Sequence, residues 1–405
     1  MNNTIKLAVA SALLAAASSA SAAGGIVAGD WTLDIGGVVN AFYTSTKTDG
    51  GQSVTSNETG LLPNYLSVSG KTRQNDLDVA FTISIQPGAA TSKSLENYNN
   101  ALQENRQAFL TFGDASWGSV KVGKDLGIYA SGAILNDMTL LGVGAGAGGG
   151  TTTTTLGRIG GGYIYPDWKS QISYTSPNFN GFSFSAGATQ AWNTQGTAAS
   201  SAYTGASGAV AAVTALDTVT TLRGGGEPAF EAQASYAFTA DAVTGKVWAS
   251  GITQNVQLTA STEKTSSAWD IGANVNAAGF GLTGYYGEGK GMGTLIQFAQ
   301  AYTNEGDKRK SDDWYVQGTY ALPGVGTKLG ASYGESTLDG VATNDLFSEK
   351  VKEQLTFGVY HPLTKHLNLV AEYTEAKSKV DYVYSGTADT SSKAKTVALG
   401  AILFF

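Results

Sequence analysis

Few side chains in this sequence could carry out catalysis. The chain has 405 residues, no cysteine and two histidines, His361 and His366. Both histidines fall in one expected short turn, with no serine placed beside them on a predicted strand and no carboxylate cluster nearby. A Ser-His hydrolase needs its base within reach of the nucleophile, and a metal centre needs converging ligands. The sequence therefore argues against an enzyme, and we expect no cofactor and no bound metal.

Three other ligand classes can be weighed from composition and motifs. The run from Gly144 to Gly149 fits G-x-G-x-x-G, but no helix follows to present its N-terminus to a phosphate. Asp312 and Asp313 form an acidic pair that could bind a divalent ion at the surface, although such pairs are more often simply solvated. A net charge of −7 with scattered basic residues argues against nucleic acid as a partner. What the remaining charged residues can do depends on the strands and loops that position them.

Apolar and polar residues alternate along many short segments. In the first of them Trp31, Leu33 and Ile35 share one face, and Thr32 and Asp34 share the other. Successive side chains of a β-strand point to opposite faces, so this period of two indicates strands with one apolar side and one polar side. The pattern recurs at 77–85, 230–238, 269–275, 314–320 and 367–373. The chain is therefore predicted to be all-β.

The connections between these segments indicate a barrel. Sixteen strands are predicted, near 31–43, 63–71, 77–86, 105–113, 118–124, 169–175, 181–190, 228–239, 243–250, 268–276, 279–287, 313–321, 327–335, 353–360, 367–375 and 395–405. Short turns alternate with long loops at 44–62, 87–104, 125–168, 191–227, 251–267, 288–312, 336–352 and 376–394. This alternation is typical of outer-membrane barrels, which must close because unpaired strand edges are costly in lipid. We therefore expect a transmembrane antiparallel 16-stranded β-barrel, wide enough to leave an aqueous channel.

The composition and the N-terminus agree with an exported barrel. Glycine makes up 53 of the 405 residues, charged residues are 14%, and no second long apolar run follows the first. Residues 1–22 read as a signal peptide, with Lys6, an apolar run over 7–17 and a small-residue cleavage site at 20–22. We expect a mature chain of residues 23–405 in the outer membrane of a Gram-negative cell, with a net charge of −8 because loss of Lys6 subtracts one from −7.

The C-terminal segment carries a more specific pattern. The chain ends K-A-K-T-V-A-L-G-A-I-L-F-F, with Val397, Leu399, Leu403 and Phe405 in phase. This ending resembles the last strand of Gram-negative outer-membrane barrel proteins, in which a terminal Phe with apolar residues at every second position is the assembly signal. The resemblance implies that these four residues engage the outer-membrane assembly machinery.

The glycine-rich stretch 127–162, inside the long loop 125–168, fits neither a helix nor a strand. Flanking and internal motifs, N-R-Q-A-F-L-T-F-G (105–113), W-G-S-V-K-V-G-K (117–124), L-G-R-I-G-G (156–161) and S-Y-T-S-P-N-F-N-G-F-S (173–183), resemble the general diffusion porins of Gram-negative bacteria. The resemblance is motif-specific over about 105–183 and a matter of pattern elsewhere. It implies that the loop folds inward as a constriction loop, where lumen water can solvate its irregular backbone.

The resemblance also implies which charged residues form the pore constriction. Arg106 matches the wall arginine of the family's R-x-A-F motif, and Arg158 matches the arginine after the constriction loop. Asp137 matches an acidic loop residue that faces those arginines, and Lys124 and Asp125 match a basic and polar pair at the end of the fifth strand. From the residues alone, the alternative is that both arginines are structural charges bonded to loop carbonyls.

Two departures from the family pattern reduce the expected field across the pore. The family often has a further wall arginine where this chain has Asn64-Tyr65-Leu66, and a loop glutamate where it has Leu140-Leu141. Opposed charges across an aqueous gap interact by about 1–4 kcal/mol, enough to bias ion traffic but not to bind tightly. With fewer opposed charges we expect a less selective pore, and the sign of its selectivity stays open.

The leading hypothesis is a passive diffusion porin for ions and small hydrophilic solutes. By the resemblance it would be a homotrimer in contact with outer-membrane lipid and lipopolysaccharide. A substrate-specific channel is the first alternative, and the Gly/Thr/Ala runs at 142–155 and 196–226 favour it. A surface adhesin or receptor barrel with partner-binding loops is the second.

Overall fold

The computed structural model describes residues 25–90, 103–146, 154–190, 227–259, 262–303, 305–341, 345–383 and 388–405. The expected signal peptide, residues 147–153 of the first Gly/Thr run and the whole second run lie outside these ranges. Among the described residues, no helix is long and apolar enough to span a membrane.

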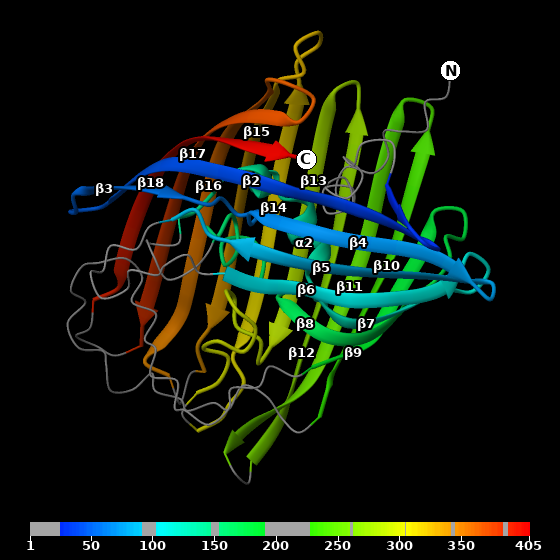
Figure 1. Cartoon of the computed structure of the whole chain (residues 1–405). Helices are drawn as coiled ribbons and strands as arrows, with labels where there is room; N and C mark the ends of the chain where they lie inside the picture. Colours follow the sequence, from blue (N-terminus) through cyan, green and yellow to red (C-terminus); the bar gives the residue numbers. More distant parts are fainter. Residues whose placement is uncertain are drawn as a thin grey trace.

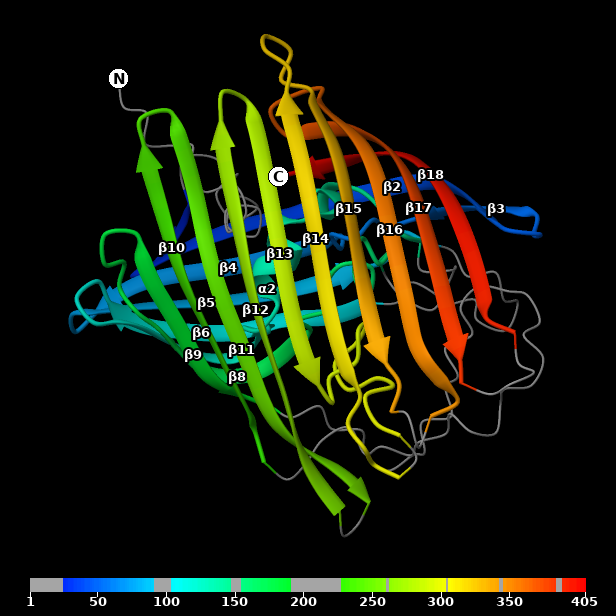
Figure 2. The same cartoon turned by 180° about the vertical axis from the view of Figure 1, so that it is seen from behind.

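Sixteen strands of the described chain form one closed antiparallel ring (Figures 1 and 2), which confirms the predicted fold class. Closure occurs at β2, which pairs with β18 on one side and with β4 on the other. The ring strands are β2 (Trp31–Thr48), β4 (Tyr65–Gln74), β5 (Leu77–Pro87), β6 (Gln103–Asp114), β7 (Gly118–Leu126), β8 (Trp168–Thr175), β9 (Phe182–Thr189), β10 (Ala229–Ala240), β11 (Val243–Thr259), β12 (Thr262–Ala277), β13 (Phe280–Lys290), β14 (Lys310–Ala321), β15 (Lys328–Asp339), β16 (Phe347–Pro362), β17 (Leu367–Tyr382) and β18 (Thr390–Phe404).

The observed strands differ in length from the predicted ones mainly at the end of the barrel that carries the long loops. Two short additional strands, β1 (Ile26–Ala28) and β3 (Ser53–Glu58), pair with β2. The expected long loop 251–267 is wrong, because β11 and β12 stay paired up to Thr259 and Thr262. On the outer face, polar residues such as Asn255 and Thr265 continue these strands, so the apolar outer row that defined the prediction stops before the strands do. Pairing of the backbone, which needs no apolar face, extends the hairpin.

All seven predicted short turns lie at one end of the ring. They join β4 to β5, β6 to β7, β8 to β9, β10 to β11, β12 to β13, β14 to β15 and β16 to β17. In an antiparallel ring alternate connections lie at the same end, and we call this the turn end and the opposite one the loop end. Positive φ values at Asn75 and Asp76, at Asn180 and at Asp241 supply the left-handed conformations that such tight turns require.

The outer and inner faces of the wall differ in chemistry. Large apolar residues of the outer rows are exposed, for example Ile172 at 61% and Leu282 at 64%. Aromatic residues of neighbouring strands touch on this outer face, with ring centroids 5.8 Å apart for Trp269 and Tyr286 and 5.6 Å apart for Trp314 and Tyr333. The inner rows carry polar residues. An apolar outside with aromatic contacts and a polar inside is the pattern of a barrel that spans a membrane.

The C-terminal residue lies at the seam where the barrel closes. Phe405 N donates to Gly37 O at 3.1 Å, and Gly37 N donates to Phe405 O at 2.9 Å. The apolar residues Val397, Leu399 and Leu403 of β18 are exposed on the outer face. The seam therefore continues the backbone pairing to the last residue of the chain.

Candidate pore constriction

The described parts of the segment between β7 and β8, residues 127–146 and 154–167, fold into the barrel and pack on one side of its wall. We call this segment the β7–β8 loop. It contains the short helix α2 (Ser131–Asn136) and the 3-10 helix η1 (Met138–Leu141). Helix α2 is labelled inside the ring in Figures 1 and 2. Its residues Ala133, Ile134 and Met138 belong to a buried cluster with inward residues of distant strands, such as Trp248 and Tyr315. The inward-folded loop of the prediction is therefore present.

Two wall carboxylates hold this loop through its backbone, one at its start and one just after η1. Glu231 of β10 accepts from Ile128 N and Tyr129 N, both at 2.8 Å. Glu372 of β17 accepts from Val143 N at 2.7 Å and Gly144 N at 2.8 Å. A loop without regular structure leaves N–H groups unpaired, and a buried donor without a partner costs about 1–3 kcal/mol. Each carboxylate satisfies two such donors at once.

The middle of the loop is bonded to the wall between these two points. Met138 N donates to Gln317 Oε1 at 2.7 Å, and the same amide donates from Nε2 to Asn136 O at 3.0 Å. Tyr315 Oη donates to Ala133 O at 2.9 Å. The loop is thus fixed along an arc of wall from β10 to β17.

Arg158 is fully buried between the loop and this arc. Its guanidinium donates to Gln354 O at 2.9 Å, to Gly161 O at 3.2 Å and to Ser332 Oγ. Burial lowers the pKa of this guanidinium, and the charge of Asp137 counteracts that shift. These contacts match the structural alternative, in which the arginine bonds to loop carbonyls. Arg158 does not reach the open lumen.

Asp137 lies on the same buried side of the loop. Its carboxylate accepts from Thr139 N at 2.9 Å and Thr139 Oγ1 at 2.6 Å, capping η1, and from Tyr163 Oη at 2.8 Å. The structure therefore brings Asp137 near Arg158, but behind the loop. The expected pairing of Asp137 with Arg106 across the gap is not present, because the Asp137 carboxylate is bonded to Thr139 and Tyr163 of the loop itself.

The burial of inward-facing residues shows where the lumen stays open. On β14, β16 and β17 the inward residues at the level of the loop are buried, for example Gln317, Thr356 and Glu372. On β5 and β6 inward residues nearer the turn end, such as Thr82 and Thr111, are partly exposed, whereas Ser84 and Gln86 nearer the loop end of β5 are buried. The β7–β8 loop covers the β10–β17 arc, so the open part of the lumen lies beside β4–β7.

A polar network lines this open side. Gln107 Nε2 donates to Asp125 Oδ1 at 3.1 Å, and Lys121 Nζ forms a short ion pair with Asp125. Arg106 is buried to 8% exposure at the rim of this network, and its Nε pairs with Glu104 Oε2 at 2.5 Å. The guanidinium carbon of Arg106 lies 5.8 Å from the ring centroid of Trp168, near the end of the β7–β8 loop.

Lys124 is a correction to the predicted site. It pairs in register with Ala108 and Ser170, in the same outer row as the exposed Val122 and Ile172. Successive strand residues face opposite sides, so Lys124 and Asp125 cannot both face the lumen. Lys121, four residues before Asp125, is the basic residue on the inner row, and the period of two could have identified it.

Other residues of the site were not predicted. One of them is Asp167, at the end of the β7–β8 loop. Burial raises the pKa of its carboxyl group, and the positive charges of Lys169, Lys124 and Arg106 partly offset that shift. Glu231 and Glu372 appeared in the sequence only as polar positions on predicted strands. Their role depends on which strand faces the loop after closure, and no local pattern contains that information.

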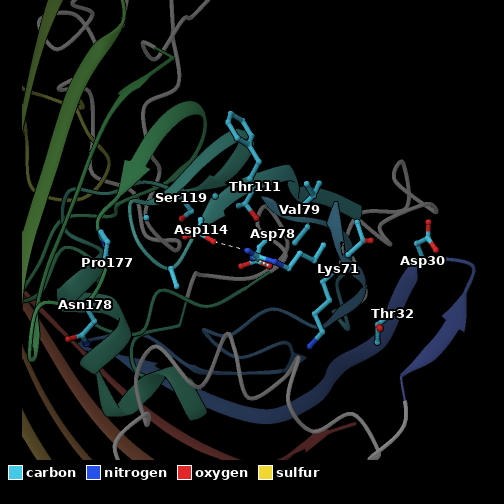
Figure 3. A pocket seen from close by; sticks show the side chains of 17 residues that line it. Asp30, Thr32, Lys71, Asp78, Val79, Thr111, Asp114, Ser119, Pro177 and Asn178 are labelled. Atoms are coloured by element: carbon cyan, nitrogen blue, oxygen red, sulfur yellow. Dashed lines mark hydrogen bonds and ion pairs between the residues drawn. The ribbon is translucent and has the colours of Figure 1, made fainter. Parts of the chain in front are cut away.

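An open cavity of about 890 Å³ lies on the same side of the lumen at the turn end. Figure 3 shows its inward side chains, among them Lys71, Asp78, Thr111 and Asp114. Arg73 bridges Asp78 at 2.8 Å and Asp114 at 3.0 Å. A lumen lined by paired charges can solvate ions of both signs.

The histidines stay apart from this site. His361, near the turn end of β16, has its Nδ1 2.8 Å from Thr327 Oγ1, and His366 lies in the β16–β17 connection. The described ranges contain no group of three or more His, Cys, Asp or Glu side chains placed to hold a metal ion.

Comparison with known proteins agrees with this architecture. Residues 8–381 match the family described as Gram-negative porin. The outer membrane channel DcaP of Acinetobacter baumannii has a similar fold, with a TM-score of 0.67, 16% identity and coverage of 94% of this chain and 100% of that one. The anion-selective porin from Comamonas acidovorans has a TM-score of 0.62 and 15% identity, with 93% of this chain and 100% of that one covered. Salmonella typhi OmpF in complex with daunomycin has a TM-score of 0.56 and 16% identity, with 94% of this chain and 99% of that one covered.

No curated protein sequence matches the chain. At 15–16% identity the solved structures establish the fold only, whereas the family match spans nearly the whole sequence. The closed ring, its polar interior and its inward-folded loop are the features that such a family requires. The chain therefore belongs to the Gram-negative porins, the outer-membrane channels through which solutes diffuse passively.

Proposed function

We propose that ions and small hydrophilic solutes cross this barrel through a passage beside β4–β7, and that the chain has no enzymatic activity. The one-sided burial of inward residues carries this proposal, because the β7–β8 loop closes the β10–β17 side. Lys121 and Asp125, on the inner rows, then border this passage, and Arg106 lies next to them where the β5–β6 pairing shifts register, so that strict alternation does not apply to it. Arg158 and Asp137 act indirectly, by holding the loop.

Purified protein in a planar bilayer tests this function. We expect stepwise currents that rise linearly with voltage and that no single class of small solute blocks. The absence of any channel would contradict the function, and block by one solute class would support a substrate-specific channel instead. Cleavage after about residue 22, contact with lipopolysaccharide and assembly as a homotrimer belong to the same proposal. OmpT of Vibrio cholerae, which has a similar fold, is known in a trimer form.

Replacing Arg106 with alanine should shift the permeability ratio toward cations. The change removes one positive charge beside the passage and leaves the Glu104 carboxylate in place. Because water screens charges in the lumen, we expect a change of at most about fivefold. Reversal potentials under a salt gradient measure it. Lys124→Ala, on the outer row, is the matched control and should leave the reversal potential unchanged; an equal shift in both variants would refute the assignment of Arg106.

Removing Phe405 should lower the yield of assembled barrel. The residue pairs with Gly37 through two backbone hydrogen bonds at the seam, and the proposed assembly signal of Val397, Leu399, Leu403 and Phe405 ends there. Leu363→Ala, an exposed apolar residue in a short turn, is the control. The yield is measured as the amount of heat-modifiable, folded protein in outer-membrane fractions. If the protein without Phe405 reaches the wild-type amount, the proposed assembly signal is refuted.

A further inference from the structure

A second loop also folds into the lumen. The segment 291–309 between β13 and β14, here the β13–β14 loop, is described apart from residue 304 and lies at the loop end (yellow in Figures 1 and 2). Its side chains Met292, Phe298, Ala301 and Tyr302 are each 1% exposed. An external loop in water would expose most of its side chains. The β13–β14 loop instead has the burial expected of an interior segment.

The apolar contacts of this loop are with the inside of the barrel and with the β7–β8 loop. The four buried residues form one cluster with Tyr129 and Ile164 of the β7–β8 loop and with inward residues of the wall. The wall members are Ala229, Ile252, Val256, Leu258 and Ala268. Burial of these four apolar side chains stabilises the docked position of the loop.

Backbone bonds join the two loops directly. Tyr165 N donates to Leu295 O at 3.1 Å, and Tyr165 and Ile296 form a parallel bridge. The Gln297 amide donates from Nε2 to Tyr165 O at 3.2 Å and to Pro166 O at 3.3 Å. The β13–β14 loop therefore pairs with the last part of the β7–β8 loop, next to where Arg106 lies.

A buried lysine joins both loops to the wall. Lys169 of β8 donates from Nζ to Glu231 Oε1 at 2.5 Å and to Gln297 Oε1 at 2.7 Å, and its side chain is 2% exposed. Glu231 is the carboxylate that holds the start of the β7–β8 loop. One charge pair thus fixes the first and last parts of the β7–β8 loop and the tip of the β13–β14 loop. A buried charge pair is costly to break because the remaining charge is left without a partner.

The far side of the β13–β14 loop is also tied down. Arg309 donates from Nε to Asp345 Oδ2 at 2.9 Å and from Nη1 to Gln300 O at 2.8 Å, and Asp345 lies in the β15–β16 connection. Phe298 and Gln300 have φ values of 67° and 55°. A bulky residue in the left-handed region is strained, so the surrounding contacts must compensate for this backbone.

We propose that the β13–β14 loop is a second constriction element, which restricts the passage at the loop end by filling the lumen above the β10–β14 wall and by bracing the end of the β7–β8 loop. Gln297 and Lys169 are its positioning residues. The inference rests on the proposed channel function, since it assigns a further part of the same passage.

Gln297→Leu tests the bracing, because it removes the amide contacts and keeps the Lys169–Glu231 pair. Gln300→Leu is the matched control, with the same replacement in the same loop: it removes an exposed side-chain contact with Lys350 and keeps the backbone bond to Arg309. With the β13–β14 loop released, we expect single-channel conductance roughly to double in Gln297→Leu, since pore width limits conduction. Gln300→Leu should conduct as the wild type does.

A disulfide supplies a second, independent measurement. The chain has no cysteine, so Tyr165→Cys with Ile296→Cys introduces one defined pair at bridge partners. We expect the pair to oxidise in the folded barrel, and oxidation to restore wild-type conductance in the Gln297→Leu background, where the reduced protein conducts more.

The outcomes separate the second constriction from the channel itself. A pair that does not oxidise, an unchanged conductance in Gln297→Leu, or a raised conductance that the disulfide does not restore would each overturn the second constriction. If wild-type protein forms no channel, the proposed function fails. A channel in which Gln297→Leu behaves like Gln300→Leu leaves that function intact and refutes only the role of the β13–β14 loop.

Discussion

Replacing Arg158 with methionine should release the middle of the β7–β8 loop and raise the conductance of the channel. Methionine keeps much of the apolar volume but cannot donate to Gly161 O, Gln354 O or Ser332 Oγ. These buried acceptors would lose their partner, and Asp137 would lose the nearest positive charge. Loss of such a buried group costs on the order of 3 kcal/mol.

Two measurements follow this change. Urea unfolding in lipid vesicles should show a lower free energy of unfolding, and single-channel records should show larger and noisier currents. Arg73→Met is the matched control for stability, because Arg73 is half exposed and its partners Asp78 and Asp114 stay hydrated without it. Wild-type stability together with wild-type conductance in Arg158→Met would contradict the anchoring role. A pure change in ion selectivity would instead favour a charge exposed to the passage.

Replacing Gly142 with alanine should displace the end of η1 from the wall. A Cβ atom at this position would lie 2.1 Å from Glu372 Oε1 and 2.3 Å from its carboxyl carbon. The carboxylate cannot move aside freely, since Val143 N, Gly144 N and Tyr360 Oη all donate to it. Overpacking at a fixed group costs about 1–3 kcal/mol. We expect the loop to shift into the passage or away from it, and the conductance to change.

Gly146→Ala is the control for this replacement. It lies in the same loop, but the nearest atoms to an added Cβ are 3.8 Å and 4.0 Å away, which is ordinary contact. Single-channel conductance of the two alanine variants in the same lipid makes the comparison. Equal values would mean that the contact between Gly142 and Glu372 does not determine the loop position.

The strands could be predicted because their signal is local. Lipid on one side and water on the other impose the period of two, which the residues show directly, and each of the sixteen expected segments overlaps a ring strand. Strand ends near the loops were less predictable. Beyond the membrane the outer face no longer needs apolar residues, so β11 and β12 continue through polar sequence.

The site was less predictable because it depends on contacts between distant segments. Lys124 was assigned from a motif where the period of two would have favoured Lys121. The partners of the β7–β8 loop, Glu231 and Glu372, lie 102 or more residues away from the backbone groups they bind. Nothing in the local sequence of the β13–β14 loop indicates that it folds inward, because its buried residues are spaced to fit the other loop rather than a helix or strand.

The position of the passage beside β4–β7 is tested most directly by thiol labelling of single cysteines, which the cysteine-free chain allows. Thr82→Cys and Thr111→Cys place the thiol on partly exposed inner positions of β5 and β6, and Thr356→Cys places it on the covered inner row of β16. A bulky water-soluble thiol reagent should reduce the single-channel current stepwise in the first two variants and leave the third unchanged. Block at Thr356→Cys without block at the other two would place the passage on the opposite side of the loop and contradict the proposed path.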